Sequence, residues 1–282
     1  MICNHPKLQI LTRYAVHHLV KCSNCGFVFA NSIPLESELV HHYEGYGRRN
    51  YLSPITVKRY HELLNRFEKF RSTRKLIDVG CGIGYFLEVA KEQNWNVYGT
   101  EFTDEAIRIC REKGINMQQG KLNPANYEAT SFDVITSFEV LEHINNPREE
   151  VQHFHRLLRQ GGAVYITTPN FNSLSRIFLK EKWNVLAYPE HLCYYTPATL
   201  QRLFTESGFS LLKIETTGIS ITRAKTSLKI SNQSYISETS DDEKFRRTLE
   251  SNSLMRSIKS VTNKLLTFGD AGDSIKATFI KK

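Results

Sequence analysis

The chain has 282 residues, of which 40% are hydrophobic and 23% are charged, and its net charge is +8. This composition suits a folded protein with a sizeable core and excludes a collagen, a disulfide scaffold and a disordered tail. No uncharged apolar run reaches the roughly 18 to 20 residues that span a bilayer. Residues 1–6 also lack the apolar stretch of a secretory signal, so we expect a cytoplasmic protein without a transmembrane segment.

The positive charge lies at the two ends of the chain. Residues 1–75 and 222–282 are basic, while residues 76–221 are mildly acidic. Solvated surface lysines and arginines explain this pattern, and so does an anionic partner such as nucleic acid, a phosphorylated substrate or a membrane surface. No run of five like charges occurs, which favours the solvated surface.

The first region, residues 1–52, contains a cysteine knuckle, Cys22-Ser23-Asn24-Cys25-Gly26, that resembles half of a zinc ribbon. Such a turn presents two thiolates to one ion, and a second pair completes a tetrahedron. Here the second pair is reduced to Cys3, with His5 as a substitute. The pattern predicts a zinc ion at Cys3, Cys22 and Cys25, either as a weakened three-ligand site or with the start of the ribbon missing.

The second region, residues 53–221, alternates helical periodicity with short apolar runs. We predict helices over 55–71, 85–93, 104–113, 147–159 and 199–207, and strands over 76–79, 96–99, 115–118, 132–136, 163–168 and 210–216. The helix over 147–159 is expected to stop at Gly161 and Gly162. The alternation implies a parallel sheet with helices on both faces and a ligand at the carboxyl ends of its strands. The third region, 222–282, adds an amphipathic helix over 245–265 and a last strand pattern. We expect this helix to pack on its own domain, and the alternatives are that it caps the substrate pocket or meets a partner.

A glycine turn follows the first strand of the second region. Its residues are Asp78, Gly80, Cys81, Gly82 and Gly84. Glycines there permit a tight turn and close approach of a ligand to the backbone, and Glu101 after the second strand can accept both hydroxyl protons of a ribose. A dinucleotide-binding turn places its third glycine where this chain has Tyr85, and Asp78 would repel a pyrophosphate. The acid suits a cationic ligand instead.

These motifs and several later segments resemble class I S-adenosylmethionine-dependent methyltransferases. The segments are 76–84, 99–101, 132–135, 139–143 and 157–162. The likeness covers roughly residues 70–221 and is nearest to ubiquinone-biosynthesis-type O-methyltransferases and to many glycan or natural-product methyltransferases. It implies an α/β, Rossmann-like sheet of seven strands flanked by helices, with an antiparallel last strand at 272–280 and the preceding residues, 222–268, as an insertion.

The resemblance also implies the cofactor and its site. S-adenosylmethionine is expected at the glycine turn and Glu101, with Phe102, Leu122 and Phe138 beside it. After the third strand such enzymes often place an acid near the adenine, whereas this chain has Gln119-Gly120-Lys121-Leu122.

The segment after the fourth strand, Glu139-Val140-Leu141-Glu142-His143, is the candidate reacting centre. On a helical turn Glu139, Glu142 and His143 share one face, and His191 follows the fifth strand near the same rim. The histidines could serve as a base or a substrate anchor, the four side chains could bind Mg²⁺, Mn²⁺ or Zn²⁺, or the pair could be purely structural. The metal arrangement resembles that of small-RNA 2′-O-methyltransferases.

The acceptor is not named by the sequence. We expect Trp183, Tyr188, Tyr194 and Tyr195 to help build its site, and the aromatic segment 41–51 either to cover the cofactor as a lid or to be a surface loop. The favoured function is O-methylation of a small molecule or glycan. The alternatives are an RNA methyltransferase, suggested by the basic ends, and a non-catalytic binding protein with a degenerate core.

Overall fold

A seven-stranded mixed sheet forms the centre of the computed structural model, which describes residues 2–3, 5–34, 51–230 and 238–282. The strands lie in the order β10-β11-β8-β7-β4-β5-β6. Their bounds are β4 Lys75–Val79, β5 Asn96–Glu101, β6 Asn116–Gln119, β7 Phe132–Phe138, β8 Leu158–Pro169, β10 Phe209–Thr217 and β11 Ser274–Lys281. Strand β11 is antiparallel to both of its neighbours, and β4 to β8 pair in parallel. The predicted α/β class and antiparallel last strand are confirmed.

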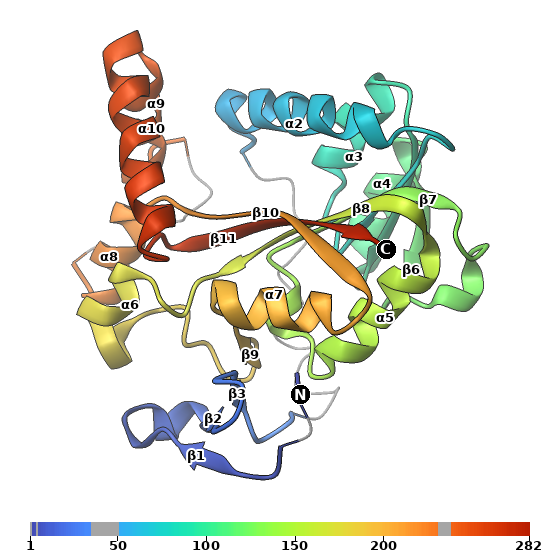
Figure 1. Cartoon of the computed structure of the whole chain (residues 1–282). Helices are drawn as coiled ribbons and strands as arrows, with labels where there is room; N and C mark the ends of the chain where they lie inside the picture. The colour runs from blue at the N-terminus through green and yellow to red at the C-terminus, as the bar shows by residue number, and fades with distance from the viewer. Residues whose placement is uncertain (1, 4, 35–50, 231–237) are drawn as a thin grey trace.

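Helices cover both faces of this sheet (Figure 1). One face carries α2 Pro54–Phe67, α3 Tyr85–Glu92 and α4 Asp104–Glu112, and the other carries α5 Pro147–Leu157 and α7 Pro197–Thr205. Four more helices stand toward the end where the parallel strands finish: α6 Leu174–Leu179, α8 Ile221–Ser227, α9 Asp241–Glu250 and α10 Ser253–Phe268. The carboxyl ends of β4, β5 and β7 meet there, which is where a sheet of this kind binds ligands.

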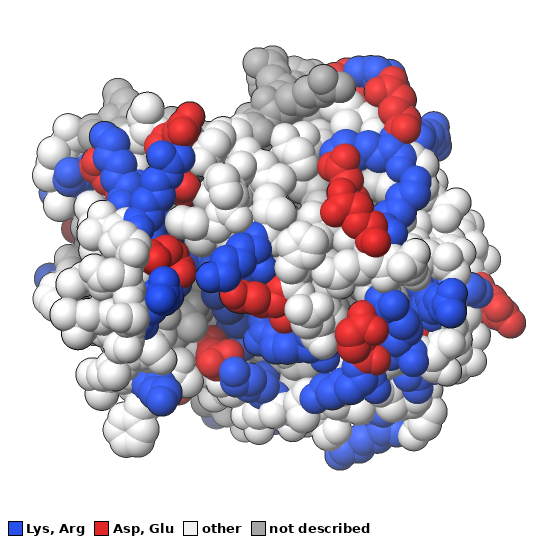
Figure 2. Space-filling model, turned by 90° about the horizontal axis from the view of Figure 1, so that it is seen from above, with Lys and Arg blue, Asp and Glu red and all other residues white. Residues whose placement is uncertain are grey.

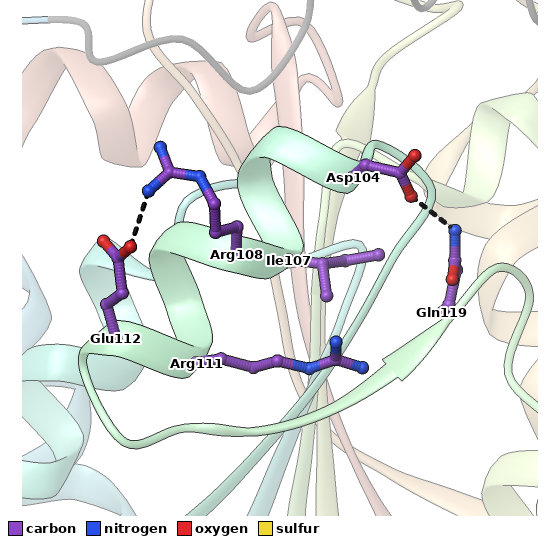
Figure 3. A pocket seen from close by; sticks show the side chains of 6 residues that line it. All are labelled: Asp104, Ile107, Arg108, Arg111, Glu112 and Gln119. Carbon is purple, nitrogen blue, oxygen red and sulfur yellow. Dashed lines mark hydrogen bonds and ion pairs between the residues drawn. The ribbon is translucent and has the colours of Figure 1, made fainter.

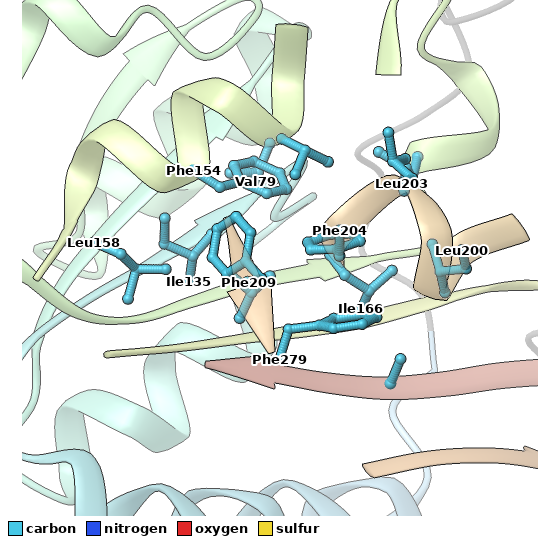
Figure 4. Packing of buried hydrophobic residues seen from close by; sticks show 14 of the residues in the cluster. Val79, Ile135, Phe154, Leu158, Ile166, Leu200, Leu203, Phe204, Phe209 and Phe279 are labelled. Atoms are coloured by element: carbon cyan, nitrogen blue, oxygen red, sulfur yellow. The ribbon is translucent and has the colours of Figure 1, made fainter. Parts of the chain in front are cut away.

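Two apolar clusters fill the layers above and below the sheet. The lower one joins α5 and α7 to the strands, and its Phe204 and Phe279 rings stack with centroids 4.2 Å apart (Figure 4). The upper one joins α2 and α3 to the strands through Leu64, Phe67 and Leu87. The alternating burial of β11, whose Ile275, Ala277 and Phe279 are fully buried below, follows from the two-residue period of a strand.

The N-terminal residues form a second, four-stranded sheet that includes a strand of the larger region. Its order is β1 Leu8–Ile10, β2 Leu19–Cys22, β3 Val28–Ala30 and β9 Cys193–Tyr194. Strand β9 pairs antiparallel with β3. The sequence did not reveal this pairing, because β9 is only two residues long and its partner lies more than 160 positions earlier in the chain.

Helix α5 and strand β8 differ from the prediction. The helix was expected to reach Arg159 and to stop at Gly161 and Gly162, but it ends at Leu157, and β8 already begins at Leu158. Gly162 lies inside the strand, where an added Cβ would meet Leu158 Cδ2 at 2.3 Å. Glycine is therefore required there by close packing within the strand rather than by the end of a helix.

The C-terminal helix also differs from the prediction. Two helices, α9 and α10, replace the single helix, and the Asn252 side chain caps α10 by accepting a hydrogen bond from the Met255 amide at 2.8 Å. The expectation that the apolar face packs on its own domain is wrong: Phe245, Leu254, Ile258, Val261 and Leu265 are exposed.

The predicted lid, 41–51, lies outside the described residues except for Tyr51. The Tyr51 hydroxyl accepts a hydrogen bond from Arg247 of α9 at 2.9 Å. Within the part of the chain that the structure describes, no helix is long and apolar enough to cross a membrane.

Candidate functional site

The glycine turn lies between β4 and α3, at the carboxyl end of the sheet. Gly80, Gly82 and Gly84 have φ values of 74°, 54° and 76°, a region that other residues rarely adopt. The Gly80 and Cys81 amides both donate to the Thr100 carbonyl of β5, at 3.1 and 3.0 Å. The turn is therefore tied to the neighbouring strand before any ligand is considered.

Two of these glycines have different surroundings. A Cβ on Gly80 would meet Val140 Cγ2 at 2.4 Å, so the glycine turn and the segment 139–143 pack directly against each other. A Cβ on Gly82 would meet nothing within 4 Å. Gly82 thus faces open space, into which a ligand can approach the backbone.

Two acids flank the turn. The Glu101 carboxylate accepts hydrogen bonds from the amides of Gly82, Phe102 and Thr103, at 3.1, 2.7 and 3.2 Å. Asp78 is buried and accepts from the Thr136 hydroxyl at 2.7 Å. Burial raises the pKa of Asp78 to about 8, against the lowering effect of the Thr136 hydrogen bond. A cation near Asp78 would favour its ionised form.

The other expected cofactor residues lie in three kinds of surroundings. Phe102 is half exposed beside Glu101, whereas Leu122 is buried in the lower apolar cluster. Phe138 packs in an aromatic group with Tyr60, Phe86 and Tyr165 under α2 and α3. The Cys81 thiol lies 3.6 Å from the Gly82 carbonyl, within the turn itself.

Segment 139–143 follows β7 and begins with an unusual backbone conformation. Glu139 has a φ of 53°, which is strained for a residue with a side chain. Its amide donates to the Thr167 carbonyl at 2.9 Å, and its carboxylate lies 3.3 Å from the Ser274 hydroxyl of β11. Glu139 is thereby directed toward β8 and β11, and a short 3-10 turn over Leu141–His143 follows.

Three of the four residues predicted at the reacting centre meet in space. Ligand-type atoms of Glu142, His143 and His191 all lie within 4.8 Å of one another. The two imidazole rings are 4.7 Å apart between centroids and nearly perpendicular. Glu139 is outside this group, because the strained backbone turns its side chain away from the face that a helical turn would have shared.

Hydrogen bonds decide which atoms of the cluster remain available. His143 Nδ1 lies 3.0 Å from the Glu190 carbonyl, and His191 Nδ1 lies 2.8 Å from the Val185 carbonyl. A carbonyl only accepts, so each Nδ1 donates at its contact, and Nε2 of His191 holds the lone pair of the neutral ring. The His143 ring also hydrogen-bonds to the Glu139 backbone. Of the Glu142 oxygens, Oε2 accepts from Thr168 at 2.9 Å, while buried Oε1 has no partner among the described residues.

Burial pushes each group of this cluster toward its neutral form. It lowers the pKa of His143, and it lowers that of His191 to about 4, with the positive charge of His143 acting in the same direction. Burial raises the pKa of Glu142 well above its usual range, and the charge of Glu139 adds to this shift. Both rings are therefore neutral at pH 7.

The aromatic residues expected at the acceptor site are mostly part of the core. Trp183, Tyr194 and Tyr195 are buried, and Tyr195 donates to the Leu141 carbonyl at 3.3 Å. These three side chains support the site from behind rather than line it. Tyr188 is partly buried and lies 3.1 Å from the Ser32 hydroxyl.

Thr136 and Thr168 hold the two buried carboxylates by hydrogen bonds, a role that the sequence analysis did not predict. Each threonine lies in a strand beside the site, and this position in the sequence could have indicated its role.

The cysteine knuckle closes the β2–β3 hairpin. The sulfur atoms of Cys3, Cys22 and Cys25 lie within 4.8 Å of one another, and those of Cys3 and Cys22 are 3.5 Å apart. His5 is not part of this group; its Nδ1 accepts from the Lys7 amide at 3.4 Å. The three thiols are thus gathered as a metal site requires, whereas the expected substitute ligand is not.

A surface hollow of about 610 Å³ lies between α4 and the end of β6 (Figure 3). Its walls carry an ion pair of Arg108 with Glu112 at 2.5 Å and a hydrogen bond from Gln119 to Asp104 at 2.7 Å. None of the residues predicted for the site lines this hollow, and its Asp104, Arg108 and Glu112 side chains already have partners. The hollow is therefore not the predicted site, whose residues lie at the turn and the cluster described above.

Comparisons with known proteins agree with this geometry. A family model described as a methyltransferase domain matches residues 48–214. The ubiquinone biosynthesis O-methyltransferase of Erwinia tasmaniensis is 36% identical over 109 residues, which are 36% of this chain and 45% of that protein. The enzyme of the same name from Azoarcus sp. is 28% identical over 154 residues, 50% of this chain and 66% of that protein. The chain thus matches between about half and two thirds of these relatives' length.

Solved structures resemble the fold. A SAM-dependent methyltransferase from Archaeoglobus fulgidus superposes with a TM-score of 0.55 at 18% identity, covering 86% of this chain and 99% of the other. Phosphoethanolamine N-methyltransferase 2 of Haemonchus contortus, solved with S-adenosyl-L-methionine, superposes with a TM-score of 0.51 at 19% sequence identity. The match covers 86% of this chain and 56% of the other. At these identities the likeness concerns the fold alone. The family match, however, spans more than half of the chain, and the chain therefore belongs to the methyltransferase-domain family, as a class I S-adenosylmethionine-dependent enzyme.

Proposed function

We propose that this methyltransferase transfers a methyl group to a hydroxyl oxygen of a small-molecule or glycan acceptor. The observation that carries the proposal is the neutral pair His143 and His191 with buried Glu142, packed behind the glycine turn through Val140. The two ubiquinone biosynthesis enzymes named above are O-methyltransferases, which agrees with such an acceptor.

The residues around the turn suit S-adenosylmethionine. We assign its ribose to Glu101, its backbone approach to Gly82, and its positive charge to the neighbourhood of Asp78, with Phe102 beside the adenine. Gly80, Cys81 and Gly84 shape the turn, and Leu122 and Phe138 support it from the core. When bound, this cofactor supplies an electrophilic methyl group and leaves as S-adenosylhomocysteine.

A hydroxyl acceptor must lose a proton when its oxygen forms the new bond to carbon. We assign that proton to Nε2 of His191, the lone-pair atom of its neutral ring, or to the neighbouring His143 ring. The carbonyls of Glu190 and Val185 hold the rings in place and would accept hydrogen bonds from the resulting imidazolium.

A second possible role for the same three residues is to bind a divalent cation. Two neutral imidazoles whose Nδ1–H groups are held by carbonyls, and a carboxylate with an unpartnered oxygen, are the donors that Zn²⁺ or Mn²⁺ prefers; Mg²⁺ prefers oxygen ligands. Such an ion would lower the pKa of an acceptor hydroxyl. Glu139, committed to β8 and β11, would not be a ligand.

The test is methyl transfer from radiolabelled S-adenosylmethionine to catechols, sugars and RNA. We expect O-methylation of a hydroxyl-bearing small molecule. His143→Gln should lower kcat at least 100-fold with little change in S-adenosylmethionine affinity, while His153→Gln on α5, away from the cluster, serves as the matched control. Dialysis against EDTA followed by addition of Mn²⁺ separates a general base from a metal ion. Activity that Mn²⁺ restores favours an ion at these three residues, because thiolates such as those of the cysteine knuckle select Zn²⁺.

Methylation of RNA in preference to small molecules would contradict the proposal. It would favour the RNA alternative, particularly if binding weakens steeply with salt.

We also propose a structural zinc ion at Cys3, Cys22 and Cys25. The support is the gathering of three sulfur atoms within 4.8 Å at a hairpin turn. Purified protein should contain close to one zinc ion per chain, and Cys22→Ser should lose it, whereas Cys110→Ser should retain it. Equal zinc content in the two variants would refute the assignment.

A further inference from the structure

Helix α10 carries an apolar stripe that faces away from the rest of the protein. Its members, spaced by four, three, four and three residues, are Leu254, Ile258, Val261, Leu265 and Phe268. At about 100° per residue, they fall within an arc of about 80° on one side of the helix. Each of them is between 46% and 93% exposed, so no described part of this chain covers the stripe.

The opposite side of α10 fastens the helix to the sheet. Leu266 is buried, and Asn263 Oδ1 accepts a hydrogen bond from the Gly218 amide at 3.1 Å. Thr267 Oγ1 accepts from the Thr216 amide of β10 at 3.2 Å. These three residues of α10 lie about 120–180° around the helix from the middle of the stripe. The stripe therefore cannot turn inward without breaking the contacts that hold the helix.

The charge of α10 itself is entirely positive. The helix contains Arg256, Lys259 and Lys264 and no acidic residue. The acids nearest in sequence are Glu250, which pairs with Lys259 and lies 4.0 Å from the Lys58 ammonium, and exposed Asp270, two positions beyond the helix end. Lys264 is exposed and borders the stripe, about 80° from its middle.

The same edge of the molecule exposes further apolar side chains. Ile177 and Phe178 of α6 are exposed, and the Leu174 amide at the start of α6 donates to the Ala271 carbonyl just after α10, at 3.0 Å. Figure 1 shows α6 and α10 along one edge. In Figure 2, seen from above with α10 at the left, this side has uncharged surface with Lys and Arg side chains beside it.

We propose that α10 docks on an anionic lipid surface. An exposed apolar stripe on a helix whose own charges are all positive complements the boundary between acyl chains and anionic headgroups. The stripe would enter this boundary, and Lys264 would extend its ammonium group to the headgroups. The inference goes beyond the proposed function and does not depend on it.

A second copy of this chain fits the stripe less well. The spacing of four and three residues also occurs in coiled coils, but there it continues over at least about three heptads, whereas α10 has 16 residues. A stable dimer takes roughly 20–30 residues from each partner, and the stripe has far fewer. Two copies of α10 would also bring only positive charges to the seam.

The test is cosedimentation of the full chain with two kinds of vesicle. One is phosphatidylcholine alone, and the other has equal parts of phosphatidylcholine and phosphatidylglycerol. We expect at least tenfold tighter binding to the anionic vesicles, because lysines and arginines close to such a surface each strengthen binding. Raising the salt from about 0.1 M to about 1 M should weaken this binding, because salt screens the attraction.

Ile258→Gln combined with Leu265→Gln removes the middle of the stripe. This double variant should bind anionic vesicles at least tenfold more weakly, because two apolar side chains no longer enter the lipid. Its Tm should stay unchanged, since both residues are exposed and glutamine is a good helix former. The matched control is Val16→Gln combined with Ile33→Gln, at exposed positions of the N-terminal region, which should bind like the unsubstituted chain.

A tryptophan in the stripe reports where the protein touches the vesicle. The two tryptophans of the chain, Trp95 and Trp183, are both buried. Phe268→Trp, at the most exposed position of the stripe, should emit at shorter wavelength when anionic vesicles are added, because the indole leaves water. Val16→Trp should show no shift.

Failure to bind anionic vesicles, undiminished binding by the α10 double variant, or an unshifted emission of Phe268→Trp would overturn the inference. Equally tight binding to phosphatidylcholine alone would refute the anionic assignment. A dimer in analytical ultracentrifugation without vesicles, dissociated by the α10 double variant, would assign the stripe to a second copy instead. S-adenosylhomocysteine binding should be the same in all variants, so the cofactor site is tested separately.

Discussion

At the scale of single residues, the site depends on glycines that serve different purposes. Gly80 and Gly82 both have positive φ, so a side chain at either position costs about 1–2 kcal/mol in backbone strain. Only Gly80 is also pressed against Val140, and only Gly82 faces open space. Alanine substitutions at the two positions therefore distinguish the effect on stability from the effect on ligand binding.

We expect Gly80→Ala to lower the free energy of unfolding by about 2–4 kcal/mol, because overpacking against Val140 adds to the strain. Gly82→Ala should cost only about 1–2 kcal/mol but weaken S-adenosylmethionine binding at least tenfold, because its methyl group enters the space left for the ligand. Urea unfolding and calorimetric titration measure the two effects. Equal loss of stability in both variants would contradict the packing argument.

Asp78 makes cofactor binding depend on pH. Its carboxyl group has a pKa of about 8, so it is mostly protonated at pH 7 in the free protein, whereas a positively charged ligand favours the ionised form. Affinity for S-adenosylmethionine should therefore rise about tenfold from pH 6 to pH 7 and level off above pH 8.

Calorimetric titration at several pH values checks this prediction, with Asp78→Asn as the control. Any titration of the ligand itself is common to both proteins. An unchanged pH profile in the variant would assign the dependence to another group.

At the scale of elements, a buried ion pair joins three parts of the sheet. Asp133 of β7 is fully buried, pairs with Arg159 of β8 at 2.6 Å, and accepts from the Ser72 and Arg74 amides that precede β4. The carboxylate thereby satisfies donors from three segments at the amino end of the sheet, opposite to the site.

Asp133→Ala should lower the free energy of unfolding by about 3–5 kcal/mol, because it leaves an arginine and two amides without their acceptor. Arg108→Ala breaks an exposed pair with Glu112 on α4 and should cost no more than about 1 kcal/mol. Thermal and urea unfolding compare them. Methyl transfer per folded molecule should stay unchanged in Arg108→Ala.

Elements were predicted best where their own residues determine them. The strand before the glycine turn and the helices starting at residues 85 and 104 agree with the prediction, because apolar spacing and capping act within a few positions. The predicted end of α5 was wrong, because Gly161 and Gly162 are typical of a helix end in the local sequence but lie inside β8 in the structure. The prediction that the apolar face of α10 packs on its own domain was also wrong. Periodicity shows that a helix has an apolar face but does not show what covers that face.

At the scale of the whole molecule, the N-terminal sheet is continuous with the support of the site. Phe27 is 1% exposed and packs against Tyr195 with centroids 5.2 Å apart, and the Tyr195 hydroxyl donates to the Leu141 carbonyl. The Leu192 amide also donates to the Glu142 carbonyl at 2.8 Å. Loss of packing in the β2–β3 hairpin should therefore also destabilise the segment at residues 139–143.

Phe27→Ala should lower the free energy of unfolding by about 3–5 kcal/mol through loss of buried contacts. It should also speed amide hydrogen exchange at residues 139–143 and 191–195. Ile10→Ala, at an exposed position of the edge strand β1, is the control and should have little effect. Exchange that quickens only within residues 2–30 would show that the N-terminal sheet is energetically separate.

The sequence by itself determined the α/β class, the glycine turn with its two acids, and the positions of Glu142, His143 and His191 at strand ends, because these depend on local spacing. Only the tertiary structure decided that Glu139 turns away from this cluster and that β9 completes the N-terminal sheet. It also decided that Glu215, which lies opposite Lys276 in the sheet, forms an ion pair with Lys213. Each of these depends on contacts between segments far apart in the chain, which periodicity and composition do not record.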